Sequence, residues 1–562
     1  MANQSNVLFL QPPKIRHLLY NALSPQGKDC CIVWHMAVRQ LKLSMERLRS
    51  HLQQQNTRTY EVIETPVTVD RMWWTNLILR SLRLILDAIS SVIFGIMYYG
   101  DSPTVLPPIT NLILLESATA LATKIRNKKL TSEEVVKSFI ARIKEINPIL
   151  NCVVDSRFDE ALEEAKTVDK LIQSNSMDEK TLEETKPFLG VPFTTKDCFA
   201  VKGLRQTAGL WCRKNMIAEE DADSVRIMRE AGAIPLCVTN VSELCMWWES
   251  SNTIYGRTNN PYHTCRIVGG SSGGEGCIQS ACGSPFGIGS DIGGSIRMPA
   301  FFNGIFGHKP TYGIVSNLGQ EPKASGEAMN FLVTGPMCRY VKDLTPLLKI
   351  LAASNVHMLK LDQKVDVQNL RYFYIEDDGG SPLVTPVHSE LRVAQKKIVT
   401  HLEKAYGIKA KKGEINVWME LIKWCVRLSK HTLPGLLLGV LEKLNNYKKN
   451  SSAYPKLLTM CADLRSEIKE LLGEDGVLLF PSHPTTAPYH TQPIFRAFNF
   501  AYTAIINVLL FPSTQCPLGL SSNGLPLGIQ VVANHYHDHL SLAVAGELEK
   551  AFGGWVCPSE VP

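Results

Sequence analysis

The stretches IVGGSSGGEG (residues 267–276) and DIGGSIRMP (residues 291–299) each place serine between glycines. A loop whose backbone N–H groups face one point needs positive or unusual φ angles, which glycine adopts and a Cβ opposes. Such a nest binds negative charge. It is not a phosphate loop, because Glu275 follows the glycines where a Walker loop needs lysine, and neither stretch has G-x-G-x-x-G spacing after a strand. The loops therefore indicate a site for an oxyanion that develops during a reaction.

The second loop is expected to supply the oxyanion hole. Its backbone donors are predicted at Ile292, Gly293, Gly294 and Ser295. Donors placed where negative charge forms stabilise the transition state, and losing one typically costs about two to three orders of magnitude in rate.

A serine nucleophile needs a base. The histidines stand in no recognisable catalytic order, and His308 is expected to be a hydrogen-bonded structural residue. A lysine kept uncharged by burial can also serve. The stretch PFTTKDCF (192–199) places Lys196 in an apolar, strand-like run, in which alternation turns Asp197 to the other face. Lys196 is therefore a candidate base, and the alternative is a strand lysine directed to the surface.

The remaining sequence predicts an α/β fold, with a single domain over residues 106–562. Residues 130–147 predict a helix that begins with a capping box of Thr131 and Glu134. Its apolar face comprises Val135, Val136, Phe139, Ile140 and Ile143.

Two buried strands are expected at residues 188–199 and 231–241. Strands alternate with helices along the chain, and this order favours a sheet covered by helices on both faces.

Composition excludes some classes of function. The net charge is +6, but residues 1–60 hold eight Lys and Arg against two acidic residues, so the remainder is neutral and no nucleic-acid partner is expected. The fifteen cysteines are scattered without paired C-x-x-C motifs. We expect most of them to be reduced core residues, and we expect no metal site.

The N-terminal region is expected to differ from the catalytic domain. Residues 1–66 are polar and basic, and they predict a poorly ordered extension. Residues 67–105 predict a hydrophobic or amphipathic membrane-associated helix, although Arg80, Arg83 and Asp87 interrupt its apolar run.

Three interpretations of this helix stay open. It lies in the membrane interface, it spans the membrane at a tilt with snorkelling arginines, or it packs on the enzyme body. The first places Trp73, Trp74, Tyr98 and Tyr99 at headgroup level. We expect a membrane-associated protein, with the side of the membrane left open.

Taken in order, GVPFTTKD (190–197), GGSSGGEG (269–276) and DIGGSIRMP resemble the amidase signature family, with 75 residues from Lys196 to Ser271 and 24 from Ser271 to Ser295. The resemblance implies a large central mixed, twisted β-sheet. It also implies a triad in which Ser295 is the nucleophile, Ser271 bridges after a cis peptide, and Lys196 is the terminal base. The resemblance implies no cofactor, and it implies that the protein forms a homodimer. The supporting residues are Ser272, Asp291 and Arg297.

Further stretches, among them SELCMWWESSNTIYGRTNNPY (242–262) and CPLGLSSNGLPLGIQVVA (516–533), resemble the branch of that family that hydrolyses fatty-acid amides. This likeness implies N-acylethanolamine and primary fatty amide substrates, a membrane surface as partner, and a candidate membrane cap at residues 417–444. The implied acyl channel comprises Cys245, Met246, Trp247 and Trp248, and the alternative for these residues is a position in the hydrophobic core.

Two alternatives remain. The first is another amidase of the same family, acting on short or aryl amides or serving as the glutaminase-like component of a tRNA amidotransferase. The second is a lipid-binding scaffold without catalysis, against which the intact Lys196, Ser271 and Ser295 argue.

Overall fold

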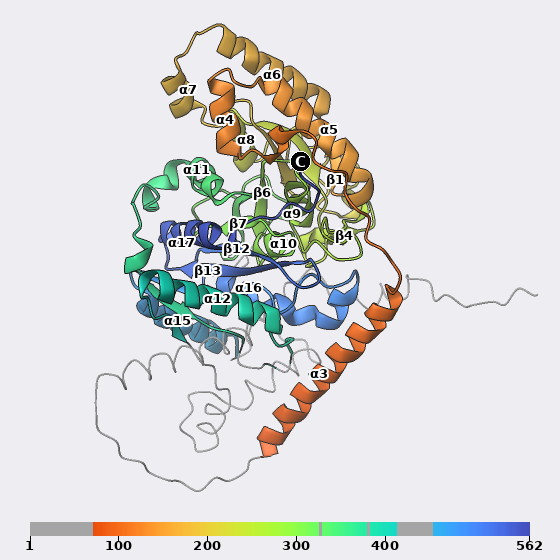
Figure 1. Cartoon of the computed structure of the whole chain (residues 1–562), viewed down its shortest axis with the longest axis vertical. Helices are drawn as coiled ribbons and strands as arrows, with labels where there is room; N and C mark the ends of the chain where they lie inside the picture. Colours follow the sequence, from red (N-terminus) through yellow and green to blue (C-terminus); the bar gives the residue numbers. More distant parts are fainter. Residues whose placement is uncertain (1–70, 325–328, 379–380, 382, 413–452) are drawn as a thin grey trace, which may run out of the picture.

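The computed structural model describes residues 71–324, 329–378, 381, 383–412 and 453–562 (Figure 1). The predicted extension at residues 1–66 and the candidate membrane cap at 417–444 lie outside these residues.

One mixed sheet of eleven strands organises the described chain, in the order β1-β3-β2-β6-β8-β7-β12-β13-β11-β9-β10. The strand β2 runs parallel to β3 and β6, and β9 runs parallel to β10 and β11, while all other neighbours are antiparallel. The strands are β1 (Val153–Ser156), β2 (Pro192–Lys196), β3 (Ile234–Thr239), β6 (Phe286–Asp291), β7 (Phe306–Lys309), β8 (Val333–Cys338), β9 (Arg371–Tyr374), β10 (Lys411–Lys412), β11 (Gly476–Phe480), β12 (Ser513–Leu520) and β13 (Pro526–Ala533). A separate pair consists of β4 (Ser251–Asn252) and β5 (Gly256–Arg257).

Helices cover both faces of this sheet, as predicted (Figure 1). Successive residues of a strand point to opposite faces, and two neighbours on β7 meet different helices. On one face, a Cβ on Gly307 would lie 2.9 Å from the Ala300 side chain of α10. On the other face, His308 bonds Asp538 of α17. The α-helices are α3 (Arg71–Met97), α4 (Ala118–Arg126), α5 (Ser132–Leu150), α6 (Phe158–Gln173), α7 (Glu179–Thr185), α8 (Asp223–Glu230), α9 (Gly273–Ser280), α10 (Arg297–Phe302), α11 (Val341–Ala352), α12 (Ser389–Tyr406), α15 (Ala453–Leu472), α16 (Ala501–Val508) and α17 (Asp538–Phe552). The short 3-10 helices are η1 (Leu112–Leu115), η2 (Trp211–Arg213), η3 (Glu243–Cys245), η5 (Ala353–Met358), η6 (Val367–Asn369) and η7 (Gln492–Phe500).

The N-cap half of the predicted capping box and the apolar face of α5 are confirmed, whereas the described residues show no bond from the Thr131 N–H back to the Glu134 side chain. The Thr131 hydroxyl accepts a hydrogen bond from the Glu134 N–H at 3.1 Å, and all five predicted apolar residues are buried. The helix runs past the predicted end, because it stops only where Asn151 takes a left-handed conformation with φ of 51°.

The two predicted strands are real but shorter than expected. The strand β2 begins at Pro192 and ends at Lys196, where the Phe199 N–H donates to the Lys196 carbonyl and closes a turn. All twelve cysteines in the described part of the chain are free thiols, and the core prediction is confirmed for the seven that are buried.

The predicted N-terminal helix is α3, and it lies against η7 with an unusual distribution of side chains. The face toward the body is partly polar: Asp87 pairs with Arg83 at 2.6 Å and with Arg496 at 3.2 Å. The outward face is apolar and exposed, and it comprises Leu79, Leu82, Leu86, Ile89, Ile93 and Ile96. Among the described helices, none combines the length and apolar character that crossing a membrane requires.

The aromatic residues predicted at headgroup level separate in the structure. Tyr98 stacks on Tyr489 of the body with ring centroids 4.8 Å apart, whereas Tyr99 is 89% exposed. The side chains of Trp73 and Trp74 lie outside those described.

Candidate active site

The parallel strands β2 and β6 end at the same edge of the sheet, and three polar side chains meet there. Lys196, the last residue of β2, is fully buried. Its Nζ donates to the Ser271 hydroxyl at 2.9 Å and to the Ser290 hydroxyl at 3.0 Å. Asp197 turns away, because its carboxylate accepts from the Thr207 N–H at 2.9 Å. The structure thus places the predicted base beside the predicted bridging serine.

Ser271 lies in the turn that leads into α9. The peptide bond between Gly270 and Ser271 is cis, where the resemblance implied one. Glycine is required before it, since a Cβ on Gly270 would lie 2.5 Å from the Trp247 carbonyl.

The neighbouring Ser272 joins the two serine loops. Its N–H donates to the Ser295 carbonyl at 3.2 Å, and its hydroxyl donates to the Ser290 carbonyl at 3.3 Å. One backbone and one side-chain hydrogen bond of Ser272 therefore join the first serine loop to the second loop and to the end of β6.

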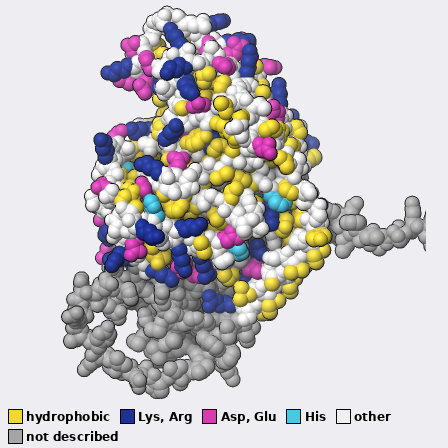
Figure 2. Space-filling view, viewed as in Figure 1, with side chains coloured by type: hydrophobic (Ala, Val, Ile, Leu, Met, Phe, Trp, Pro, Cys, Tyr) yellow, Lys and Arg dark blue, Asp and Glu magenta, His cyan; other side chains and the backbone are white. Residues whose placement is uncertain are grey.

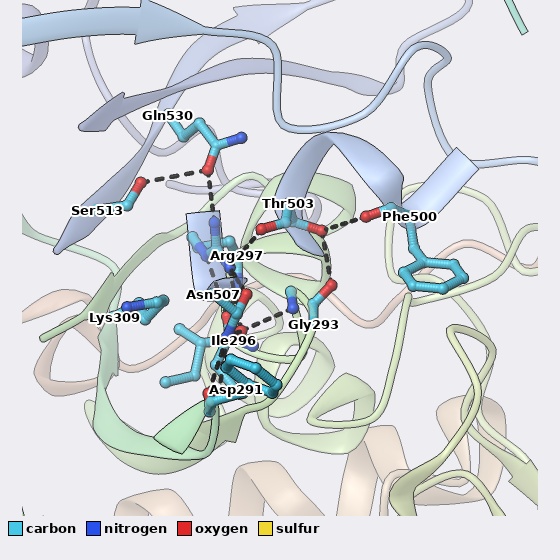
Figure 3. A network of polar contacts seen from close by, with 12 residues as sticks. Asp291, Gly293, Ile296, Arg297, Lys309, Phe500, Thr503, Asn507, Ser513 and Gln530 are labelled. Carbon is cyan, nitrogen blue, oxygen red and sulfur yellow. Dashed lines mark hydrogen bonds and ion pairs between the residues drawn. The ribbon is translucent and has the colours of Figure 1, made fainter. Parts of the chain in front are cut away.

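A buried ion pair braces the second loop (Figure 3). The guanidinium of Arg297 bonds both oxygens of Asp291 at 3.1 Å, and its Nη1 donates to Gln530 at 2.7 Å. Asn507 of α16 donates to Asp291 at 2.8 Å. Burial opposes the charge of Asp291, but Arg297 outweighs it, so the pKa of this carboxyl lies well below its ordinary value. Asp291 is therefore a fixed negative charge.

Some of the N–H groups predicted to form the oxyanion hole are free, and one of them is already hydrogen-bonded within the protein. Within the described chain, the N–H groups of Ile292, Gly293 and Ser295 make no hydrogen bond. The prediction of a free donor at Gly294 is wrong, because the Gly294 N–H already donates a hydrogen bond to Asp291 at 2.6 Å. Its φ of 118° and the Thr503 side chain beside it, 2.0 Å from an added Cβ, explain why glycine stands there. The available donor set is therefore smaller than the sequence predicted.

Ser295, the predicted nucleophile, is 7% exposed. Its hydroxyl has no hydrogen-bond partner among the described residues, and its carbonyl accepts from the N–H of Ser272, the residue after Ser271.

The four residues predicted for an acyl channel occupy different environments. Met246 is 50% exposed, while Trp248 is 2% exposed and packs on His483 and Phe302 in the hydrophobic core. Trp248 thus takes the core position that is the alternative to a channel role. Trp247 is partly buried and packs on the same core cluster.

Cys245 lies nearer the polar centre. Leu244 and Cys245 both have positive φ, 56° and 57°, a conformation that costs non-glycine residues energy and recurs at functional sites. Hydrogen bonding to Cys198 lowers the pKa of the Cys245 thiol to about 6, and Lys196 contributes in the same direction.

Some residues of this site were not found from the sequence. Ser290 precedes Asp291 directly at the end of β6, and strand alternation was the one available signal. Thr503, Asn507 and Gln530 lie more than 200 residues from the loop, and no local pattern marks them. The prediction for His308 is confirmed, since the buried ring bonds Thr514 and Asp538.

Buried serines on a cis-peptide turn, a buried lysine at a strand end and a glycine-rich loop with free backbone N–H groups lie together at one edge of an α/β sheet. A family model described as Amidase matches residues 134–405 and 436–542. This chain belongs to the amidase family, which confirms the resemblance of its motifs.

Among curated relatives, human fatty-acid amide hydrolase 2 is 49% identical over 491 residues, covering 81% of this chain and 92% of the relative. The Danio rerio fatty-acid amide hydrolase 2-A is 50% identical over 493 residues, with the same coverage. One component of the glutamyl-tRNA(Gln) amidotransferase of Caldanaerobacter subterraneus is 27% identical over 476 residues, covering 76% of this chain and 94% of that relative.

A solved structure described as fatty acid amide hydrolase shares the fold, with a TM-score of 0.66 and 23% identity. The match covers 92% of this chain and 95% of that one. The mixed α/β architecture is therefore that of the family.

Proposed function

We propose that this chain hydrolyses fatty-acid amides to a free fatty acid and an amine or ammonia, through an acyl-enzyme on Ser295. The hydrogen bond of 2.9 Å from buried Lys196 to Ser271, beside the loop that carries Ser295, is the observation on which the mechanism rests. The choice of fatty-acid amides as substrates is supported by the fatty-acid amide hydrolases that are 49% and 50% identical to this chain. They match it far more closely than the amidotransferase component does, at 27% identity.

The first half of the reaction forms the acyl-enzyme. Lys196, with its amine uncharged, takes a proton from Ser271 while Ser271 takes the proton of Ser295. The Ser295 oxygen attacks the amide carbonyl, and the resulting oxyanion accepts hydrogen bonds from the free N–H groups of Ile292 and Gly293. Lys196 is fully buried, and the low dielectric constant around a buried group strengthens its polar interactions.

The leaving nitrogen must be protonated before it departs, because an amine anion is too poor a leaving group. Ser271 delivers this proton and recovers one from Lys196, which returns the lysine to its uncharged form. Water then attacks the acyl-enzyme and releases the fatty acid.

The outward face of α3 supports a membrane surface as partner. Figure 2 shows hydrophobic side chains along this helix, and the exposed residues Leu82, Leu86 and Ile89 share one face. A helix that turns polar groups to its own protein and apolar groups outward suits a lipid interface. We expect L82S/L86S/I89S to reduce sedimentation with phosphatidylcholine vesicles, while hydrolysis of a soluble short-chain amide is unchanged. Equal sedimentation of both proteins would contradict this placement.

One experiment tests the enzymatic proposal. The full chain and S295A are incubated in parallel with oleamide, anandamide and glutamine, and released acid is measured; a fluorophosphonate probe labels active serine. We expect both lipid amides to be hydrolysed and Ser295 to be labelled, with neither result in S295A. Turnover of glutamine alone would favour the amidotransferase-like alternative, and absence of a labelled serine would favour the lipid-binding scaffold.

A further inference from the structure

Glu275, the residue that breaks the phosphate-loop pattern of the first serine loop, is buried near the lysine of the relay, and no step of that relay uses it. We propose that Glu275 is a positioning residue for Lys196, and that its carboxylate stabilises the proton which Lys196 takes up while the acyl-enzyme forms. This role rests on the proposed function, because it belongs to that reaction.

The hydrogen bonds of Glu275 place its carboxylate beside Lys196. One oxygen accepts from the Thr194 hydroxyl at 2.9 Å, and the other accepts from the Thr239 hydroxyl at 2.7 Å. Thr194 and Lys196 share a face of β2, because they are two residues apart, and Thr239 is the register partner of Lys196 on β3. The carboxylate therefore lies across the β2–β3 pair on the face that carries the lysine, about 6 to 7 Å along the strand.

The neighbouring strand leaves room for this carboxylate. Gly287 of β6 is the register partner of Thr194, and a Cβ there would lie 1.8 Å from a Glu275 oxygen. The same Cβ would lie 2.5 Å from Gln279 Nε2, which donates to Glu275 at 3.0 Å. Three donors from three elements thus hold one buried carboxylate in a space that a missing side chain provides.

The charge of Glu275 depends on pH and on the groups around it. Burial raises the pKa of Glu275 to about 7, while its hydrogen bonds and Lys196 oppose that rise. Cys237 of β3 also lies near Glu275, and burial and Glu275 raise the pKa of its thiol well above the ordinary value, so this thiol stays neutral. Cys198 and Cys245 interact with Lys196 itself.

Above about pH 7, where Glu275 is ionised, proton uptake by uncharged Lys196 takes the pair from one negative charge to none. In a buried site this neutralisation is favourable, whereas the same uptake beside a neutral amide would leave a lone buried cation.

The pH dependence of turnover separates this role from a structural one. For E275Q we expect the plateau rate of oleamide hydrolysis to fall and the acidic limb of the pH–rate profile to move about one pH unit lower, because the lysine loses its anionic neighbour. E275D keeps the negative charge but places it one methylene further from Lys196. The acidic limb of its pH–rate profile is therefore expected between those of the parent and E275Q. The control E249Q alters a buried carboxylate that bonds His490 and Thr491, and its limb should coincide with that of the parent.

Fluorophosphonate labelling of Ser295 provides a second readout, with each rate normalised to the final labelled fraction so that misfolded protein does not count. The same displacement of the limb is expected. A lower plateau in E275Q and E275D with an unmoved limb would overturn the role of Glu275 and leave the proposed function standing. A parent chain without lipid-amide turnover would instead overturn the proposed function.

Discussion

Two buried carboxylates lie beside the serine loops, and their surroundings differ. Asp291 is bonded directly to a guanidinium, and its pKa lies well below the ordinary value despite burial. Glu275 accepts only from two hydroxyls and an amide, and burial raises its pKa to about 7. One carboxylate therefore carries a constant charge that shapes a loop, while the other changes its charge in the range where the enzyme would work. The identity of the donor, more than burial, decides which of these a carboxylate becomes.

The largest effect is expected from breaking the constant pair. In R297M, Asp291 remains buried without its cation, which costs about 3–5 kcal/mol of stability and lowers the melting temperature strongly. The control R226M alters a surface arginine of α8 that pairs with Asp223 and Glu230, and its melting temperature should stay near that of the parent. Similar melting temperatures for R297M and R226M would contradict the bracing role of the pair.

A smaller effect is expected from Glu275, and it depends on pH. Because the folded-state pKa lies above the ordinary value of 4.5, folded protein holds a proton that unfolded protein releases between pH 4.5 and about 7. This contribution to stability is complete below pH 4.5 and is lost as pH rises through 7. The melting temperature of E275Q should therefore gain on that of the parent across this range. A difference that stays constant from pH 4.5 to 7 would show that Glu275 does not titrate there.

The smallest effect is expected at Ser290, which shares the Lys196 amine with Ser271. S290A removes one of two hydrogen bonds to the amine, worth about 1–1.5 kcal/mol, so kcat should fall about tenfold while KM is unchanged. S284A is the matched control, because Ser284 is equally buried but bonds the Phe286 carbonyl at the start of β6. Equal kcat values for S290A and S284A would show that Ser290 does not position the lysine.

The parts that the sequence predicted correctly are those with a local signal. The Thr131 N-cap marks the start of α5, and the apolar runs around Lys196 and in residues 231–241 mark two buried strands. Glycine patterns also identified both serine loops, because the backbone there approaches other chain segments too closely for a Cβ.

The parts that were missed depend on tertiary contacts. Gly294 counts as a free donor from sequence alone, and only the folded position of Asp291 shows that its N–H is engaged. Likewise, the carboxylate of Glu275 is recognisable as a neighbour of Lys196 only once β2, β3 and β6 are aligned. The polar inner face of α3 follows from its contact with Arg496, more than 400 residues away.

The central claim is that buried Lys196, at the end of β2, serves as the base for Ser271 and, through it, for Ser295. Its most direct test is the rate of oleamide hydrolysis by K196A, compared with the parent and with K202A, an exposed lysine six residues further along. The account predicts a loss of about 10²–10⁴-fold in kcat for K196A, with K202A at the parental rate. Hydrolysis by K196A at the parental rate would contradict it.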